Sequence, residues 1–176
     1  MKKILRNLLI LSVFLTSPTF GTEACPLPEL KDTPANSAAC YFYRGTSAFR
    51  EARYAQAAIY WKALIGLKSV AVEEEHLKIS AYNNLGYLYF YGKGVEPNKK
   101  AAIEYWGFAM KSGNEEAAYH LCHAHADSKE ATYNPKIALG YCKEGLRRYG
   151  LLKERGPELE EIVAQLKAYV RKLEKR

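Results

Sequence analysis

The chain has 176 residues, of which 48% are hydrophobic and 26% are charged, and its formal net charge is +7. This composition is typical of one folded domain of ordinary size and excludes an intrinsically disordered chain. The positive surplus is scattered and falls to +4 when residues 1–21 are left out, so it excludes a strongly basic surface for nucleic acid, and we expect no nucleic-acid partner.

Residues 1–21 have the pattern of a cleaved secretory signal peptide. A basic start with Lys2, Lys3 and Arg6 precedes an apolar run at residues 8–15, and small residues follow the run. The run is too short to span a bilayer comfortably, and no later segment approaches the ~18 apolar residues of a transmembrane helix. We therefore expect a periplasmic or secreted protein with no membrane-spanning segment.

The cleavage position has two candidates, after Gly21 and after Ala24, because small residues precede both bonds. Cleavage after Ala24 would leave Cys25 as the first residue, which is where a lipoprotein carries its lipid. Residues 22–24 are Thr, Glu and Ala, whereas lipoprotein signals have leucine or another small apolar residue there. We favour a free periplasmic protein over a lipoprotein.

Residues 22–36 contain three prolines, which predicts an irregular lead-in to a folded domain at residues 37–176. Two stripes of apolar residues at helical spacing then follow, separated by a break at Arg53 and Tyr54. This pattern predicts a first pair of antiparallel helices at about residues 37–67.

A second helix pair is predicted at about residues 73–113. Its turn, residues 92–98, contains two glycines, which permit positive φ, and a proline, which cannot continue a helix. Asn98 is expected to cap the helix that follows the turn. A third pair is predicted at about residues 114–149, with Pro135 at the first position of its second helix.

The last predicted element is a helix at residues 156–175, where apolar residues recur at steps of three and four. Its remaining faces are rich in Glu, Lys and Arg. A helix with one apolar stripe and otherwise charged faces suits the end of a stack of helices, where it caps the exposed core.

The second and third pairs are related by an internal repeat. Residues 79–149 divide into two frames that match without a gap at an offset of 36 residues. A repeat of this length is typical of a solenoid, because each unit can bury its apolar face only against its neighbours. We therefore predict an all-α fold, an α-solenoid of about three antiparallel helix pairs with a C-terminal capping helix. The matches include Ala81 with Ala117, Leu85 with Leu121, Asn98 with Asn134, Lys100 with Lys136, Ala102 with Ala138 and Tyr105 with Tyr141.

The four cysteines are expected to form two disulfides, because an exported protein with an even number of cysteines folds in an oxidising compartment. Three pairings are possible from the count alone. Cys122 and Cys142 are equally far from residue 132 in the predicted loop of the third pair, so they should meet across the antiparallel hairpin. Cys25 is then left to pair with Cys40, which would tie the lead-in to the first helix.

The internal repeat supports the pairing of Cys122 with Cys142. The offset of 36 places these two cysteines on Gly86 and Trp106 of the second pair, a small residue opposite a large one. We infer that the disulfide takes the place of that glycine–tryptophan packing in the third pair.

The second pair resembles a Sel-one-like repeat, a member of the tetratricopeptide superfamily. The resemblance rests on residues 81–89, on the Gly-Lys-Gly-Val turn at residues 92–95 and on the helix after it, with Lys100, Ala101, Tyr105, Trp106 and Ala109. Residues 41–64 are more similar to an ordinary tetratricopeptide unit, because Gly45, Ala57, Trp61 and Leu64 fit its spacing.

The third pair departs from the family pattern. Cys122 stands where the glycine is expected and His125 where the tyrosine is expected, and the glycine-rich turn is missing, so its assignment rests on the offset of 36. The resemblance covers about 110 residues. It implies a right-handed stack of antiparallel helix pairs used for protein interaction, and it implies no catalytic residues.

A candidate metal site consists of His120, Cys122, His123 and His125, which lie within six residues of one another. His120 and His123 share a helix face, but structural zinc requires four ligands and Cys122 is expected to be used in a disulfide. The chain also lacks a nucleophile elbow, a phosphate loop and a zinc-protease motif. We therefore expect no metal, no cofactor and no enzymatic activity.

The candidate binding site is the concave groove that the family resemblance implies, lined by the first helix of each pair. Amide side chains have little reason to lie in an apolar seam between helices, so Asn83, Asn84 and Tyr87 are the strongest candidates. Aromatic side chains in such a groove make good anchors for a partner. Other inward positions are Phe42, Thr46, Phe49, Phe90 and Asp127, and the three phenylalanines could equally pack between repeats. The residues selected as the binding site are Tyr43, Arg50, Asn83, Asn84, Tyr87, Tyr91, Tyr119, His120 and His123.

The predicted function is that of an exported, monomeric scaffold that holds a protein partner or an extended peptide in this aromatic groove. The family resemblance implies neutralisation of an antibacterial effector by an immunity protein, or a part in assembly of the cell envelope or in host interaction. Two alternatives stay open: an envelope enzyme acting on cell-wall material with His120 or His123 as base, and a structural homo-oligomer.

Overall fold

The structure is a computed structural model that describes residues 25–27, 32–152 and 156–175, so the predicted signal peptide and both predicted cleavage positions lie outside the described residues. Within these ranges the chain forms α-helices and no β-strand, which confirms the predicted all-α class. None of the described helices is both long and apolar enough to cross a bilayer. The helices are α1 (Ala38–Arg50), α2 (Tyr54–Ile65), α3 (Glu75–Tyr91), α4 (Lys99–Lys111), α5 (Glu115–Ala126), α6 (Pro135–Gly150) and α7 (Pro157–Glu174), and a short 3-10 helix, η2 (Val72–Glu74), precedes α3.

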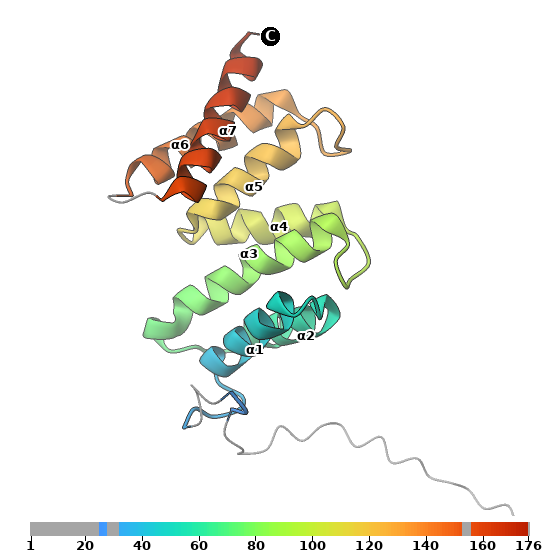
Figure 1. The fold of residues 1–176 in the computed structure, drawn as a ribbon, viewed down its shortest axis with the longest axis vertical. Coiled ribbons are helices and arrows are strands. Elements are labelled where there is room, and N and C mark those ends of the chain that lie inside the picture. The colour runs from blue at the N-terminus through green and yellow to red at the C-terminus, as the bar shows by residue number, and fades with distance from the viewer. Residues whose placement is uncertain (1–24, 28–31, 153–155, 176) are drawn as a thin grey trace, which may run out of the picture.

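The helices follow one another along the long axis of the molecule, from α1 and α2 at one end to α6 and α7 at the other (Figure 1). Each helix packs mainly against its neighbours in the sequence, and α1 also contacts α3 while α5 contacts α7. The buried apolar residues accordingly form three successive clusters, the first centred on α1 to α3, the next on α3 to α5 and the last on α5 to α7. The core is therefore a row of local contacts between adjacent helices.

Asparagine side chains fix the start of three of these helices. Asn98 accepts a hydrogen bond from the amide of Ala101, which confirms its predicted role as the N-cap of α4. Asn134 does the same for α6, at the matching position 36 residues later, and Pro135 occupies the first turn as predicted. Asn114 caps α5 in the same way.

The first two helix pairs are held by the same contact between a glycine and a tryptophan. A Cβ atom added to Gly45 would lie 2.6 Å from Cδ1 of Trp61, and one added to Gly86 would lie 2.6 Å from Cδ1 of Trp106. Each indole Nε1 also donates a hydrogen bond to the carbonyl three residues before its glycine, Trp61 to Phe42 O at 3.3 Å and Trp106 to Asn83 O at 3.1 Å. Both rings are almost completely buried.

A disulfide occupies the corresponding place in the third pair. Cys122 on α5 and Cys142 on α6 are joined, with their Cα atoms 4.7 Å apart and both side chains buried. Cys25 is joined to Cys40 at the start of α1. Both predicted disulfides are confirmed, and each helix pair thus has one close contact that sets the separation of its two helices.

The glycine–tryptophan contact predicts opposite outcomes for two Gly→Ala substitutions. Gly86→Ala forces a methyl group into the ring of Trp106, and we expect a loss of about 1–3 kcal/mol in the free energy of unfolding, as for other overpacked cores. Gly107→Ala is the control, because apart from its chain neighbours and its own helix backbone no described atom lies within 4 Å of its added Cβ. Since alanine favours a helix over glycine by about 0.5–1 kcal/mol, Gly107→Ala should be neutral or stabilising. Urea denaturation of both variants tests this, and equal losses would contradict the role of Gly86.

The buried disulfide of the third pair predicts a large loss of stability when it is removed. Closing a loop of 20 residues stabilises a fold by roughly 3 kcal/mol in the chain-entropy model. We expect the double variant Cys122→Ala/Cys142→Ala to lose at least that amount, measured by urea denaturation without reductant. Cys25→Ala/Cys40→Ala is the comparison at the edge of the fold, and a smaller loss for the Cys122/Cys142 variant than for this one would contradict the importance of the inner bond.

Candidate functional site

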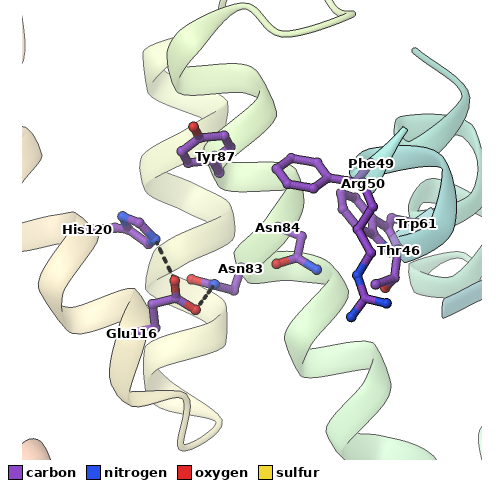
Figure 2. A pocket seen from close by; sticks show the side chains of 9 residues that line it. All are labelled: Thr46, Phe49, Arg50, Trp61, Asn83, Asn84, Tyr87, Glu116 and His120. Atoms are coloured by element: carbon purple, nitrogen blue, oxygen red, sulfur yellow. Dashed lines mark hydrogen bonds and ion pairs between the residues drawn. The ribbon is translucent and has the colours of Figure 1, made fainter. Parts of the chain in front are cut away.

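A cavity of about 370 Å³ lies where the first helices of the three pairs, α1, α3 and α5, face one another (Figure 2). It combines a row of polar groups with aromatic rings. Of the residues selected as the binding site from the sequence, five line this cavity, at least one from each first helix. The lining residues are Thr46, Phe49 and Arg50 from α1, Trp61 from α2, Asn83, Asn84 and Tyr87 from α3, and Glu116 and His120 from α5.

Asn83 is the most enclosed polar residue of the cavity, with only 3% of its surface exposed. Its Nδ2 donates a hydrogen bond to Oε2 of Glu116 at 3.0 Å. Its Oδ1 is buried and has no hydrogen-bond partner among the described residues. Buried polar atoms are nearly always paired, and leaving one unpaired costs about 1–3 kcal/mol. This oxygen is therefore a candidate acceptor for a hydrogen bond from a ligand.

Glu116 lies between Asn83 and His120, as Figure 2 shows. Its Oε1 is 3.5 Å from Nε2 of His120, one helical turn further along α5. The hydrogen bond with His120 holds the pKa of the Glu116 carboxyl below its ordinary value of 4.5, and the bond from Asn83 adds to this effect against the opposing influence of burial. The carboxylate is therefore ionised at neutral pH, and about half of the side chain, 53%, is open to solvent.

Aromatic rings form the remaining wall of the cavity. Phe49 packs edge-on against Tyr87, with their ring centroids 6.0 Å apart, and lies 5.8 Å from Trp61. The imidazole of His120 stacks on Trp106, with centroids 4.8 Å apart and planes 16° apart. The ring of His120 is therefore held in place both by this stack and by Glu116.

Arg50 and Asn84 present polar groups that are free for a ligand. Arg50 is the last residue of α1 and is exposed, and its guanidinium forms no ion pair with another described residue. Asn84 is half-buried and makes no hydrogen bond within the described part of the chain. In Figure 2 Arg50 lies on the opposite side of Asn84 from Glu116, so the cavity has a positive and a negative end.

The other predicted groove residues lie outside the lining of this cavity. Tyr43 is exposed on α1, and Tyr91 is exposed at the end of α3, where its ring lies 4.8 Å from that of Tyr87. Tyr119 donates a hydrogen bond from its hydroxyl to Oε1 of Gln165 at 2.7 Å, so it is directed toward α7. His123 also lies toward α7, with its ring 6.1 Å from that of Tyr169.

Sequence reasoning missed Glu116 and Trp61 as cavity residues. Glu116 belongs to a Glu-Glu pair at the start of α5, which has the appearance of a solvated helix end. The available signal was its spacing from His120, because residues four apart on a helix lie on the same face. Trp61 fits the spacing of a tetratricopeptide unit in the sequence, and in the structure it packs on Gly45 and also lines the cavity.

The histidine and cysteine cluster on α5 is used in packing. Cys122 is in a disulfide, and the Nδ1 of His125 lies 2.7 Å from the carbonyl oxygen of Thr132 while its ring stacks on that of Tyr141. In the described part of the chain, no group of three or more His, Cys, Asp or Glu residues is placed to hold a metal ion.

Comparisons with models of known protein families, with curated proteins and with solved structures give no match to this chain.

The lowered pKa of Glu116 predicts a specific dependence of stability on pH. Because the folded-state pKa lies below the value in the unfolded chain, ionised Glu116 contributes stability above the ordinary carboxyl pKa, and this contribution disappears as the pH falls through the folded-state pKa. We expect the difference in free energy of unfolding between wild type and Glu116→Gln to shrink from about pH 5.5 to about pH 3.

Urea denaturation at several pH values measures this difference. Glu115→Gln is the matched control, because Glu115 is the neighbouring carboxyl and does not line the cavity. A difference that stays constant across this range for Glu116→Gln would show that the contact with His120 does not stabilise the folded carboxylate.

Proposed function

We propose that this chain is an exported helical-repeat scaffold that binds an extended segment of a protein partner across the cavity between α1, α3 and α5. The observation that carries the proposal is the cavity itself, in which the first helices of three successive pairs each supply side chains to one place. A segment lying across all three helices would contact every pair at once.

The polar groups of the cavity suit a peptide backbone. An extended backbone presents N–H donors and C=O acceptors, and Asn84 offers both kinds of partner while Oδ1 of Asn83 offers an unused acceptor. The rings of Phe49 and Tyr87 offer apolar area for a side chain of the same segment. A volume of about 370 Å³ is at the small end for ligand pockets and suits a few side chains of a segment.

The repeat architecture is part of the proposal. The glycine–tryptophan contacts in the first two pairs, and the disulfide at the matching place in the third, support a solenoid of the Sel-one-like type, and its right-handed sense rests on the family resemblance. The two disulfides support export to the periplasm or beyond, where such bonds persist. We propose a monomer that acts either as an immunity protein or in envelope assembly, and these two settings rest on the family resemblance alone.

The polar and aromatic lining of the cavity favours binding as the first proposal. The pairing of Nε2 of His120 with Glu116 is one that a general base can also have, so an envelope enzyme with His120 as base is the alternative. The hydroxyl of Thr46 is engaged, because it donates a hydrogen bond to the carbonyl oxygen of Phe42. The side chains best placed to act on a ligand are therefore the amides, the rings and the two charges.

Selection from a random peptide library displayed on phage tests the proposal, with residues 25–176 of the protein as bait. We expect peptides that bind the wild type and bind Asn84→Ala at least about tenfold more weakly, as for a contact at the centre of an interface. Gln56→Ala is the matched control, because it removes an amide on α2, outside the cavity. Peptides that bind the two variants equally well, or no selected peptide at all, would contradict this function.

A further inference from the structure

The end of the cavity at α5 has more hydrogen-bond acceptors than donors. An ionised carboxylate has about four acceptor positions, and Glu116 uses one with Nδ2 of Asn83 and directs another toward Nε2 of His120. The Oδ1 of Asn83 adds a further acceptor with no partner among the described residues. A ligand that satisfies this end must therefore bring several N–H groups.

The orientation of the Asn83 amide follows from its neighbour. If the amide were turned over, its oxygen would face the carboxylate oxygen of Glu116 at the present 3.0 Å and both atoms would be acceptors. The observed orientation places Nδ2 toward Glu116, so Oδ1 is the atom that remains available. Asn83 lines the cavity although only 3% of its surface is exposed, so a donor has to lie directly against the cavity wall to reach this oxygen.

The charge of Glu116 has no permanent counter-ion in the described part of the chain. Its one ion-pair partner is His120, and an imidazole is charged only when it is protonated. The other acidic residues that form ion pairs, Glu51, Glu130, Glu144 and Glu174, are each paired with a lysine or an arginine, and these partners are always charged at neutral pH. Glu116 therefore differs from them in leaving its negative charge available to a ligand.

Building on the peptide-binding function above, we propose that the bound segment inserts a lysine or arginine side chain at this end, where its N–H groups donate to Oδ1 of Asn83 and to the carboxylate of Glu116. Arg50 at the opposite end then faces a carbonyl or carboxylate group of the same segment, which sets the direction in which the segment lies.

A double-mutant cycle on a peptide from the selection tests this proposal. The peptide is one whose binding depends on Asn84, and its basic residue is replaced by norleucine, which keeps the aliphatic chain and removes the charge. The dissociation constants of both peptides are measured by isothermal titration calorimetry on wild type, on Glu116→Gln and on Glu115→Gln. Glu116→Gln keeps an oxygen that accepts from Asn83, and circular dichroism shows whether each variant is folded.

We expect each single change to weaken binding by roughly tenfold or more, and the two changes together to weaken it little more than either one alone, because they remove the same contact. Glu115→Gln should change the dissociation constant less than about threefold, since Glu115 does not line the cavity. This pattern supports the proposal.

Two other outcomes would overturn it. If peptides that depend on Asn84 carry no basic residue, or bind Glu116→Gln as tightly as wild type, then the cavity binds a segment but the free oxygen of Asn83 is satisfied by water, and this proposal alone fails. If no peptide depends on Asn84, the peptide-binding function fails and this proposal fails with it.

Discussion

In the first two helix pairs, a tryptophan ring of the second helix lies so close to one position on the first helix that a Cβ atom does not fit there. Gly45 and Gly86 occupy these positions, and the indole rings of Trp61 and Trp106 fill the space. In the third pair the matching positions hold two cysteines, which are joined by a disulfide. The separation of the helices within each pair, and so the spacing of α1, α3 and α5 along the molecule, depends on these three contacts.

The same contacts build the cavity. The carbonyl oxygen of Asn83 accepts the indole N–H of Trp106, while its side chain donates to Glu116 on the next pair. One residue thus joins the packing inside the second pair to the surface of the third. His120 repeats this arrangement, because its ring stacks on the same tryptophan and its Nε2 faces Glu116. The position of the polar groups is therefore a consequence of how the pairs pack, and a change in that packing would move these groups.

The sequence was sufficient to predict the helices and both disulfides. The helices follow from local periodicity and from capping residues such as Asn98, and the disulfides follow from the register of the repeat. The site was harder to predict. Residue type and helix position are enough to single out Asn83 and Asn84, whereas they do not predict that Tyr119 is directed toward α7, where its hydroxyl donates to Gln165. The spacing of Glu116 from His120 places the two on one helix face, but its contact with Asn83, 33 residues away, has no local pattern that predicts it.

The glycine–tryptophan contacts also determine which part of the molecule tryptophan fluorescence can follow. The chain has two tryptophans, and they occupy the equivalent buried positions of the first and second pairs, while the third pair has a disulfide there. Indole fluorescence is therefore a signal of the N-terminal two thirds of the stack, whereas circular dichroism records every helix. A difference between the two signals during unfolding would distinguish unfolding of the first two pairs from unfolding of the third pair and α7, without any label being added to the protein.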